Sequence, residues 1–125
     1  MRLLLDTHIY LWWLEDDSQL SKKARLLITN ANAVYVSSVS IWEMSIKQGL
    51  GKLAVDINSL VLAIEMNSFL ELPVSAQHAV VTSQLPLLHR DPFDRMLIAQ
   101  AMYEPLQFLT ADATLQQYSD LVELV

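Results

Sequence analysis

Short apolar runs recur along the chain, and longer segments with helical spacing of their apolar positions separate most of them. The first runs are apolar at consecutive positions rather than at alternate ones, which is typical of strands buried on both faces of a parallel sheet. The runs predicted to be strands are residues 2–5, 34–36, 69–73, 107–110 and 121–125. The predicted helices are residues 21–29, 38–48, 57–66, 75–82 and 92–102, followed by a short one at 113–118.

Strands and helices therefore alternate from one end of the chain to the other. This order predicts an α/β fold with a central, mostly parallel sheet that helices cover on both faces. The chain has 125 residues without a repeat or a linker-like segment, so we expect one domain spanning residues 1–125.

The amino-acid composition excludes several classes of protein. With 53% hydrophobic and 18% charged residues the chain is not of the disordered type, and without cysteine it has neither disulfides nor thiolate metal sites. No basic segment followed by a long apolar run opens the sequence, so we expect a cytoplasmic protein without a membrane span. The net charge of −6 has the wrong sign for binding nucleic acid by neutralising phosphates alone.

Acidic residues stand where a parallel sheet places its functional crevice, beyond the carboxyl ends of the strands. Asp6 follows the first predicted strand and Asp112 the fourth, while Asp94 lies in the first turn of the helix at 92–102. Glu43 lies among apolar neighbours in the helix at 38–48, an unusual setting for a carboxylate.

Each acid also has a structural explanation. Asp6 and Asp112 could simply cap the helices that follow them, a role worth about 1 kcal/mol each. Asp91, which precedes a proline, is predicted to be the cap of the helix that carries Asp94. Glu43 and Lys47 are four residues apart in the order that favours a surface ion pair.

The four acids together indicate more than any one of them. Carboxylates gathered in one crevice repel each other, and a hard divalent cation such as Mg²⁺ or Mn²⁺ relieves that repulsion. Such an ion can lower the pKa of a bound water and stabilise the oxygens of a phosphoryl displacement. Metal-dependent hydrolysis of phosphodiesters is therefore the leading hypothesis.

Four segments, in order and spacing, resemble the PIN-domain ribonucleases of the VapC toxin family. The segments are LLLDTH at 3–8, SIWEMSIK at 40–47, HRDPFDRMLIAQA at 89–101 and LTAD at 109–112. The resemblance implies a PIN-like three-layer α/β/α fold and an Mg²⁺- or Mn²⁺-dependent endoribonuclease that acts as a toxin. It also implies a homodimer and a cognate antitoxin protein, which would supply any DNA binding.

The resemblance assigns the catalytic and metal-binding roles to Asp6, Glu43, Asp94 and Asp112. Asp94 is preferred to Asp91 because Ala99 and Ala101 then keep the family's spacing from the acid. Thr110 matches a hydroxyl residue that precedes the last acid by two positions, and it would contact metal-bound water or simply end the strand.

Several nearby residues receive no catalytic role. His8 and His89 are interpreted as walls of the crevice, because water on a metal ion needs no histidine to lose a proton near neutral pH. Arg90 and Arg95 are expected to contact phosphate or to pair with the acids. Trp12 and Trp13 are expected to divide between the core and a dimer surface, without evidence for stacking on RNA bases.

Two other functions remain as alternatives. A non-catalytic PIN module that binds protein or RNA would share the fold, although all four acids are retained. A phospho-receiver signalling domain fits less well, because Asp6 has no acidic neighbour and no lysine follows Lys52.

Overall fold

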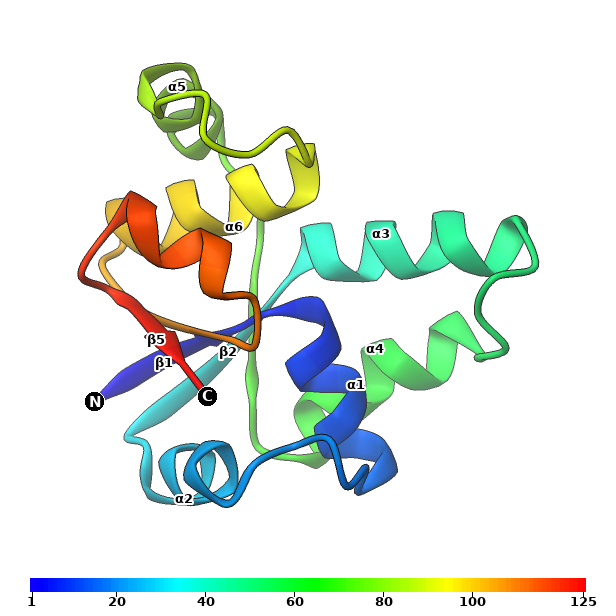
Figure 1. Ribbon diagram of the computed structural model, residues 1–125. Helices are drawn as coiled ribbons and strands as arrows, with labels where there is room; N and C mark the ends of the chain where they lie inside the picture. The colour runs from blue at the N-terminus through cyan, green and yellow to red at the C-terminus, as the bar shows by residue number, and fades with distance from the viewer.

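A five-stranded sheet runs through the middle of the computed structural model, which describes residues 1–125 (Figure 1). All neighbouring strands are parallel, in the order β3-β2-β1-β4-β5. The strands are β1 (Arg2–Leu5), β2 (Ala33–Ser37), β3 (Leu70–Leu72), β4 (Gln107–Thr110) and β5 (Val122–Leu124). The predicted α/β class with a parallel central sheet is confirmed.

Strand β1 occupies the centre of the sheet and explains why its leucines are consecutive. Leu3 and Leu5 point into one hydrophobic core, and Leu4 points into the other, with no exposed surface on any of the three. Both faces of this strand are buried, so alternation of apolar and polar residues is not required.

Helices cover both faces of the sheet. The helices are α1 (Thr7–Glu15), α2 (Lys22–Asn30), α3 (Ser38–Gly49), α4 (Ile57–Met66), α5 (Ala76–Gln84) and α6 (Pro92–Tyr103), with a 3₁₀ helix η1 (Ala113–Tyr118). Figure 1 shows α1, α2 and α4 on one side of the sheet and α6 on the other, with α5 packed on α6. Helix α3 joins the two cores, since Met44 belongs to the first and Val39 to the second. None of these helices combines the length and the apolar character needed to cross a lipid bilayer.

The predicted strands and helices are all present, with ends that differ by at most two residues from the prediction. One helix, α1, was not predicted as such. Its segment from Ile9 to Leu14 is apolar at every position, and Ile9, Tyr10 and Leu11 are fully or almost fully buried. A helix that is apolar on all sides lacks the period of 3.6 residues by which an amphipathic helix is found in a sequence.

Candidate active site

The acidic residues meet where the order of the strands reverses, between β1 and β4. Asp6 directly follows β1, and Asp112 lies two residues after β4. The two strand ends are tied together, because the backbone N–H of Asp6 donates to the carbonyl oxygen of Leu109 at 2.9 Å. Crevices at such reversals are the usual binding sites of parallel α/β sheets.

Asp6 is buried, with 7% of its surface exposed, and its side chain does not cap a helix. It stands at the N-terminal cap position of α1, yet its side chain makes no capping hydrogen bond there. Instead, the hydroxyl of Thr110 donates to Oδ2 of Asp6 at 2.6 Å. Burial raises the pKa of Asp6, against the hydrogen bond from Thr110, which lowers it. The helix-cap explanation is therefore wrong for Asp6, and Thr110 orients this carboxylate.

Asp91 and Asp94 have different roles at the start of α6. The carboxylate of Asp91 accepts hydrogen bonds from the backbone N–H groups of Phe93 and Asp94, at 2.8 and 3.2 Å, and Pro92 occupies the first helical position. This is the predicted cap. The arrangement leaves the side chain of Asp94, rather than that of Asp91, to face the crevice.

Asp94 is part of a compact cluster of possible metal ligands. One ligand atom from each of His89, Asp94 and Asp112 lies within 4.8 Å of the others, and Nε2 of His89 is 2.8 Å from Oδ2 of Asp94. Burial and the negative charge of Asp6 raise the pKa of Asp94 to about 6, although the contact with His89 lowers it. Carboxylate oxygens and an imidazole nitrogen suit a divalent cation, and Mn²⁺ tolerates the nitrogen better than Mg²⁺ does.

Asp112 caps the 3₁₀ helix η1 while it faces the crevice. Its Oδ1 atom accepts hydrogen bonds from the backbone N–H and the hydroxyl of Thr114, at 3.0 and 2.7 Å. The hydroxyl of Thr114 is the main reason why the pKa of Asp112 is lowered. The predicted cap is confirmed here, and Oδ2 remains available to another partner.

Glu43 reaches the same region from helix α3, and it is held by two neighbours. The Thr7 hydroxyl donates to Oε1 at 2.8 Å, and Nζ of Lys47 lies 3.0 Å from Oε2. The ion pair with Lys47 was predicted, but Glu43 is buried, with only 6% of its surface exposed. Because Thr7 follows Asp6 in the chain, Glu43 lies beside that carboxylate and its charge adds slightly to the raised pKa of Asp6.

The structure thus gathers the four acids unequally. Asp94 and Asp112 belong to the compact cluster, Asp6 affects Asp94 through its charge, and Glu43 lies next to Asp6. His89, which the sequence analysis treated as a wall of the crevice, belongs to the compact cluster. Its position five residues before Asp94 was the available signal, but the contact depends on the turn between α5 and α6.

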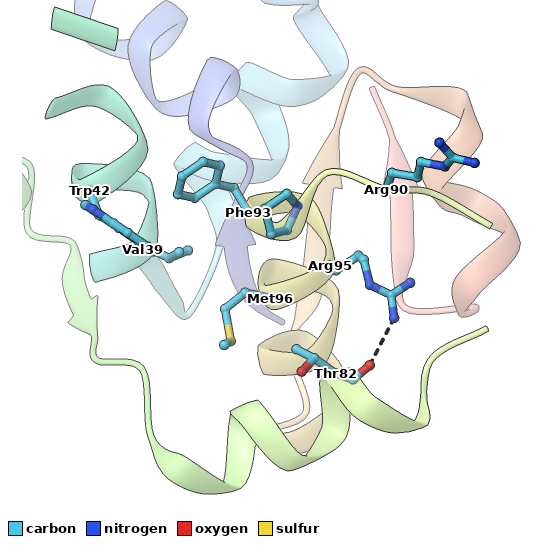
Figure 2. Close-up of a pocket in the computed structure, with 8 residues that line it drawn as sticks. Val39, Trp42, Thr82, Arg90, Phe93, Arg95 and Met96 are labelled. Atoms are coloured by element: carbon cyan, nitrogen blue, oxygen red, sulfur yellow. Dashed lines mark hydrogen bonds between the residues drawn. The ribbon is translucent and has the colours of Figure 1, made fainter. Parts of the chain in front are cut away.

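Arg95 stabilises that turn. Its guanidinium donates to the carbonyl oxygens of Thr82 and Pro86, at 3.0 and 2.9 Å, and Figure 2 shows the side chain directed toward Thr82. Arg95 therefore forms no ion pair with the acids, and the expected pairing with them is wrong.

Two depressions lie near the acids. A groove of about 420 Å³ between α3 and α6 contains Trp42 and Phe93 in an edge-to-face contact, with ring centroids 5.2 Å apart (Figure 2). A hollow of about 260 Å³ lies on the side of α1 and includes both Asp6 and Asp112 in its wall. Of these two depressions, only the hollow beside α1 gives access to the acids, because none of the four acids lines the groove.

The model of one protein family matches almost the whole chain. The model described as "PIN domain" matches residues 3–121. The chain belongs to the PIN-domain family. The match includes every segment on which the resemblance was based, and it leaves the phospho-receiver alternative without support.

Relatives of this PIN domain include proteins of known name and structure. It is 28% identical over 121 residues to Ribonuclease VapC22 of Mycobacterium tuberculosis, covering 93% of this chain and 91% of that protein. Among solved structures, VapBC2 from Rickettsia felis, bound to a DNA fragment from their promoter, has a TM-score of 0.69 at 18% identity and covers 100% of this chain and 98% of its own. FitAcB from Neisseria gonorrhoeae has a TM-score of 0.65 at 20% identity, covering 90% and 89%. The two structures share the PIN fold with this chain.

Proposed function

We propose that this PIN domain is a metal-dependent endoribonuclease and the toxin of a toxin–antitoxin pair. The observation that carries the proposal is the cluster of Asp94, Asp112 and His89, with the buried Asp6 beside it, at the reversal point of the sheet. The name of its relative, Ribonuclease VapC22, supports RNA as the substrate.

Asp6, Glu43, Asp94 and Asp112 are the proposed metal ligands, and His89 is a further donor next to Asp94. When bound, Mg²⁺ or Mn²⁺ supplies a coordinated water of lowered pKa and positive charge beside the phosphate oxygens. The chain's own residues set the ligands in place before that: Thr110 orients Asp6, Thr7 orients Glu43, and Asp91 fixes the start of the helix that bears Asp94.

The partners we propose are a cognate antitoxin and a second copy of this chain. An arginine or lysine of the antitoxin would enter the acidic crevice, since a guanidinium can bridge two carboxylates in place of a cation. Exposed apolar residues nearby offer sites for the antitoxin's apolar side chains; these are Ile46, Leu50, Val61, Leu62 and Met66 on and beside α3 and α4. DNA binding would come through the antitoxin, as the net charge of −6 suits this chain poorly for DNA.

The homodimer would use the apolar groove between α3 and α6. Trp42 is 60% exposed at its edge, and such a large apolar surface usually marks a contact. Sedimentation of the protein without antitoxin should give a dimer, and W42E should shift it toward the monomer. A wild-type protein that stays monomeric at all concentrations would contradict this arrangement.

The decisive experiment is cleavage of a mixed RNA pool by the purified protein with Mg²⁺ or Mn²⁺ and again with EDTA. We expect cleavage that needs the ion and that D6N and D94N abolish without unfolding the protein. Cleavage in EDTA would contradict the metal mechanism. A folded protein that cuts no RNA with either ion would instead indicate a non-catalytic PIN module.

A further inference from the structure

The hollow beside the acids combines two carboxylates with two aromatic rings. It holds about 260 Å³ and is lined by Asp6, His8, Trp12, Ala111 and Asp112. His8 and Trp12 lie four residues apart on α1, so their rings share one face of that helix. The ring centroids are 6.0 Å apart, and the ring planes are inclined by 41°.

The next residue, Trp13, does not line the hollow and has a different environment. The indole N–H of Trp13 donates to Oδ1 of Asn67 at 3.1 Å, and its ring packs on Phe69 with centroids 5.9 Å apart. Trp13 is thus fixed within the fold. Trp12 rests partly on the core but also lines the hollow, and His8 is exposed at its mouth.

A flat, uncharged ligand fits this wall better than an anion does. An indole face attracts any aromatic ring, and the lining contains no lysine or arginine that could bind a phosphate directly. The volume is below the range of about 300–1,000 Å³ found for drug-sized ligands, which matches a single ring system. The imidazole of His8 has two ring nitrogens, which can form hydrogen bonds with the edge of a base.

We propose that the hollow is a nucleobase subsite, in which Trp12 stacks on one base of the RNA strand and His8 contacts the edge of that base. The inference rests on the proposed ribonuclease function and deepens it. Single-stranded RNA is commonly held by stacking of splayed bases on aromatic side chains. Because Asp112 belongs both to the wall of the hollow and to the compact metal cluster, the base would belong to a nucleotide next to the cleaved phosphodiester.

The test uses a short single-stranded RNA and a series of copies, each lacking one base. Binding is measured by fluorescence anisotropy with Ca²⁺, and cleavage is measured in parallel with Mg²⁺ or Mn²⁺. The variants are W12A, W12F and H8A. Y103A is the matched control, because Tyr103 is an exposed aromatic residue at the other end of the helix that carries Asp94.

We expect W12A to weaken binding about tenfold or more, W12F to retain most of the affinity, and Y103A to change nothing. At one position, loss of the base should weaken binding by wild type to a similar degree but have little further effect on W12A. This lack of additivity is the signature of a direct contact. Melting temperatures identify any loss of affinity that comes from unfolding, and W12F preserves the packing if W12A does not fold.

The outcomes separate this inference from the proposed function. If W12A binds and cleaves every RNA of the series as wild type does, the subsite is wrong and the ribonuclease stands. If wild type binds the RNA in the expected pattern but never cuts it, the enzymatic function is wrong and the subsite stands. If wild type binds none of the RNAs, both the base subsite and the ribonuclease function are wrong. A W12A variant that loses only the antitoxin would assign the hollow to a protein side chain and overturn the inference.

Discussion

Asp94 shows how a single carboxylate can cost stability in exchange for affinity toward a cation. Its pKa of about 6 lies above the usual value of 3.8, so the folded protein holds this proton more tightly than the unfolded chain does. Between these two values the folded state binds more protons, and stability therefore falls as the pH rises through the window. Above pH 6 the ionised group remains a destabilising charge unless a cation binds it.

We predict that D94N is more stable than wild type at pH 7.5 in EDTA, by about 1–2 kcal/mol, and that the difference shrinks toward pH 4. Asparagine keeps the shape of the side chain without its charge. Thermal unfolding at several pH values measures the effect, and Mg²⁺ or Mn²⁺ should stabilise wild type more than D94N. A D94N protein that is less stable at pH 7.5 would show that the charge of Asp94 is already compensated within the fold.

Lys47 is a second single residue with a measurable effect, because it holds one oxygen of Glu43. Its ammonium lies 3.0 Å from Oε2 of that buried carboxylate and competes with any cation for it. We expect K47M to lower the stability of the metal-free protein by about 1 kcal/mol and to tighten the binding of Mn²⁺. Titration calorimetry measures the affinity, with K52M as the control for loss of one positive charge. Weaker Mn²⁺ binding by K47M would mean that Lys47 positions Glu43 for the ion.

The start of helix α6 holds both a stabilising cap, Asp91, and a candidate catalytic residue, Asp94, within one turn. Asp91 accepts two backbone N–H groups, so D91A should cost about 0.5–2 kcal/mol, whereas D91N should cost little because asparagine caps equally well. Both variants should still cleave RNA when folded. Urea unfolding and cleavage assays separate the two effects, and a stable D91N protein without activity would move the catalytic role from Asp94 to Asp91.

The helices and strands also show which parts of the structure were accessible from sequence. Apolar runs and capping residues predicted the strands and all but one helix, because those signals are local. Helix α1 escaped prediction, since its run of consecutive apolar residues hides the helical periodicity. Asp6 and Asp112 could be placed from the strand ends they follow. The contact of His89 with Asp94 could not, because it depends on a turn that Arg95 holds through carbonyl oxygens distant in sequence.

The charge of the protein as a whole determines what its partner must supply. A net charge of −6 and an acidic crevice call for a basic antitoxin segment. We predict that expression of this chain alone arrests growth of a bacterial host, that D6N is harmless, and that the adjacent small reading frame relieves the arrest. Growth curves with matched protein levels test this. Normal growth with abundant folded wild-type protein would argue against a toxin.

The hydrogen bond from Thr110 to Asp6 joins residues 104 positions apart. Strand β4, which carries Thr110, is also the strand that brings Asp112 beside β1. A ribosome must therefore translate almost the entire chain before the crevice can form, and a polypeptide from interrupted translation lacks part of the site. Under the proposed function, a host that synthesises this protein would be exposed to its activity only after synthesis of the chain is nearly complete.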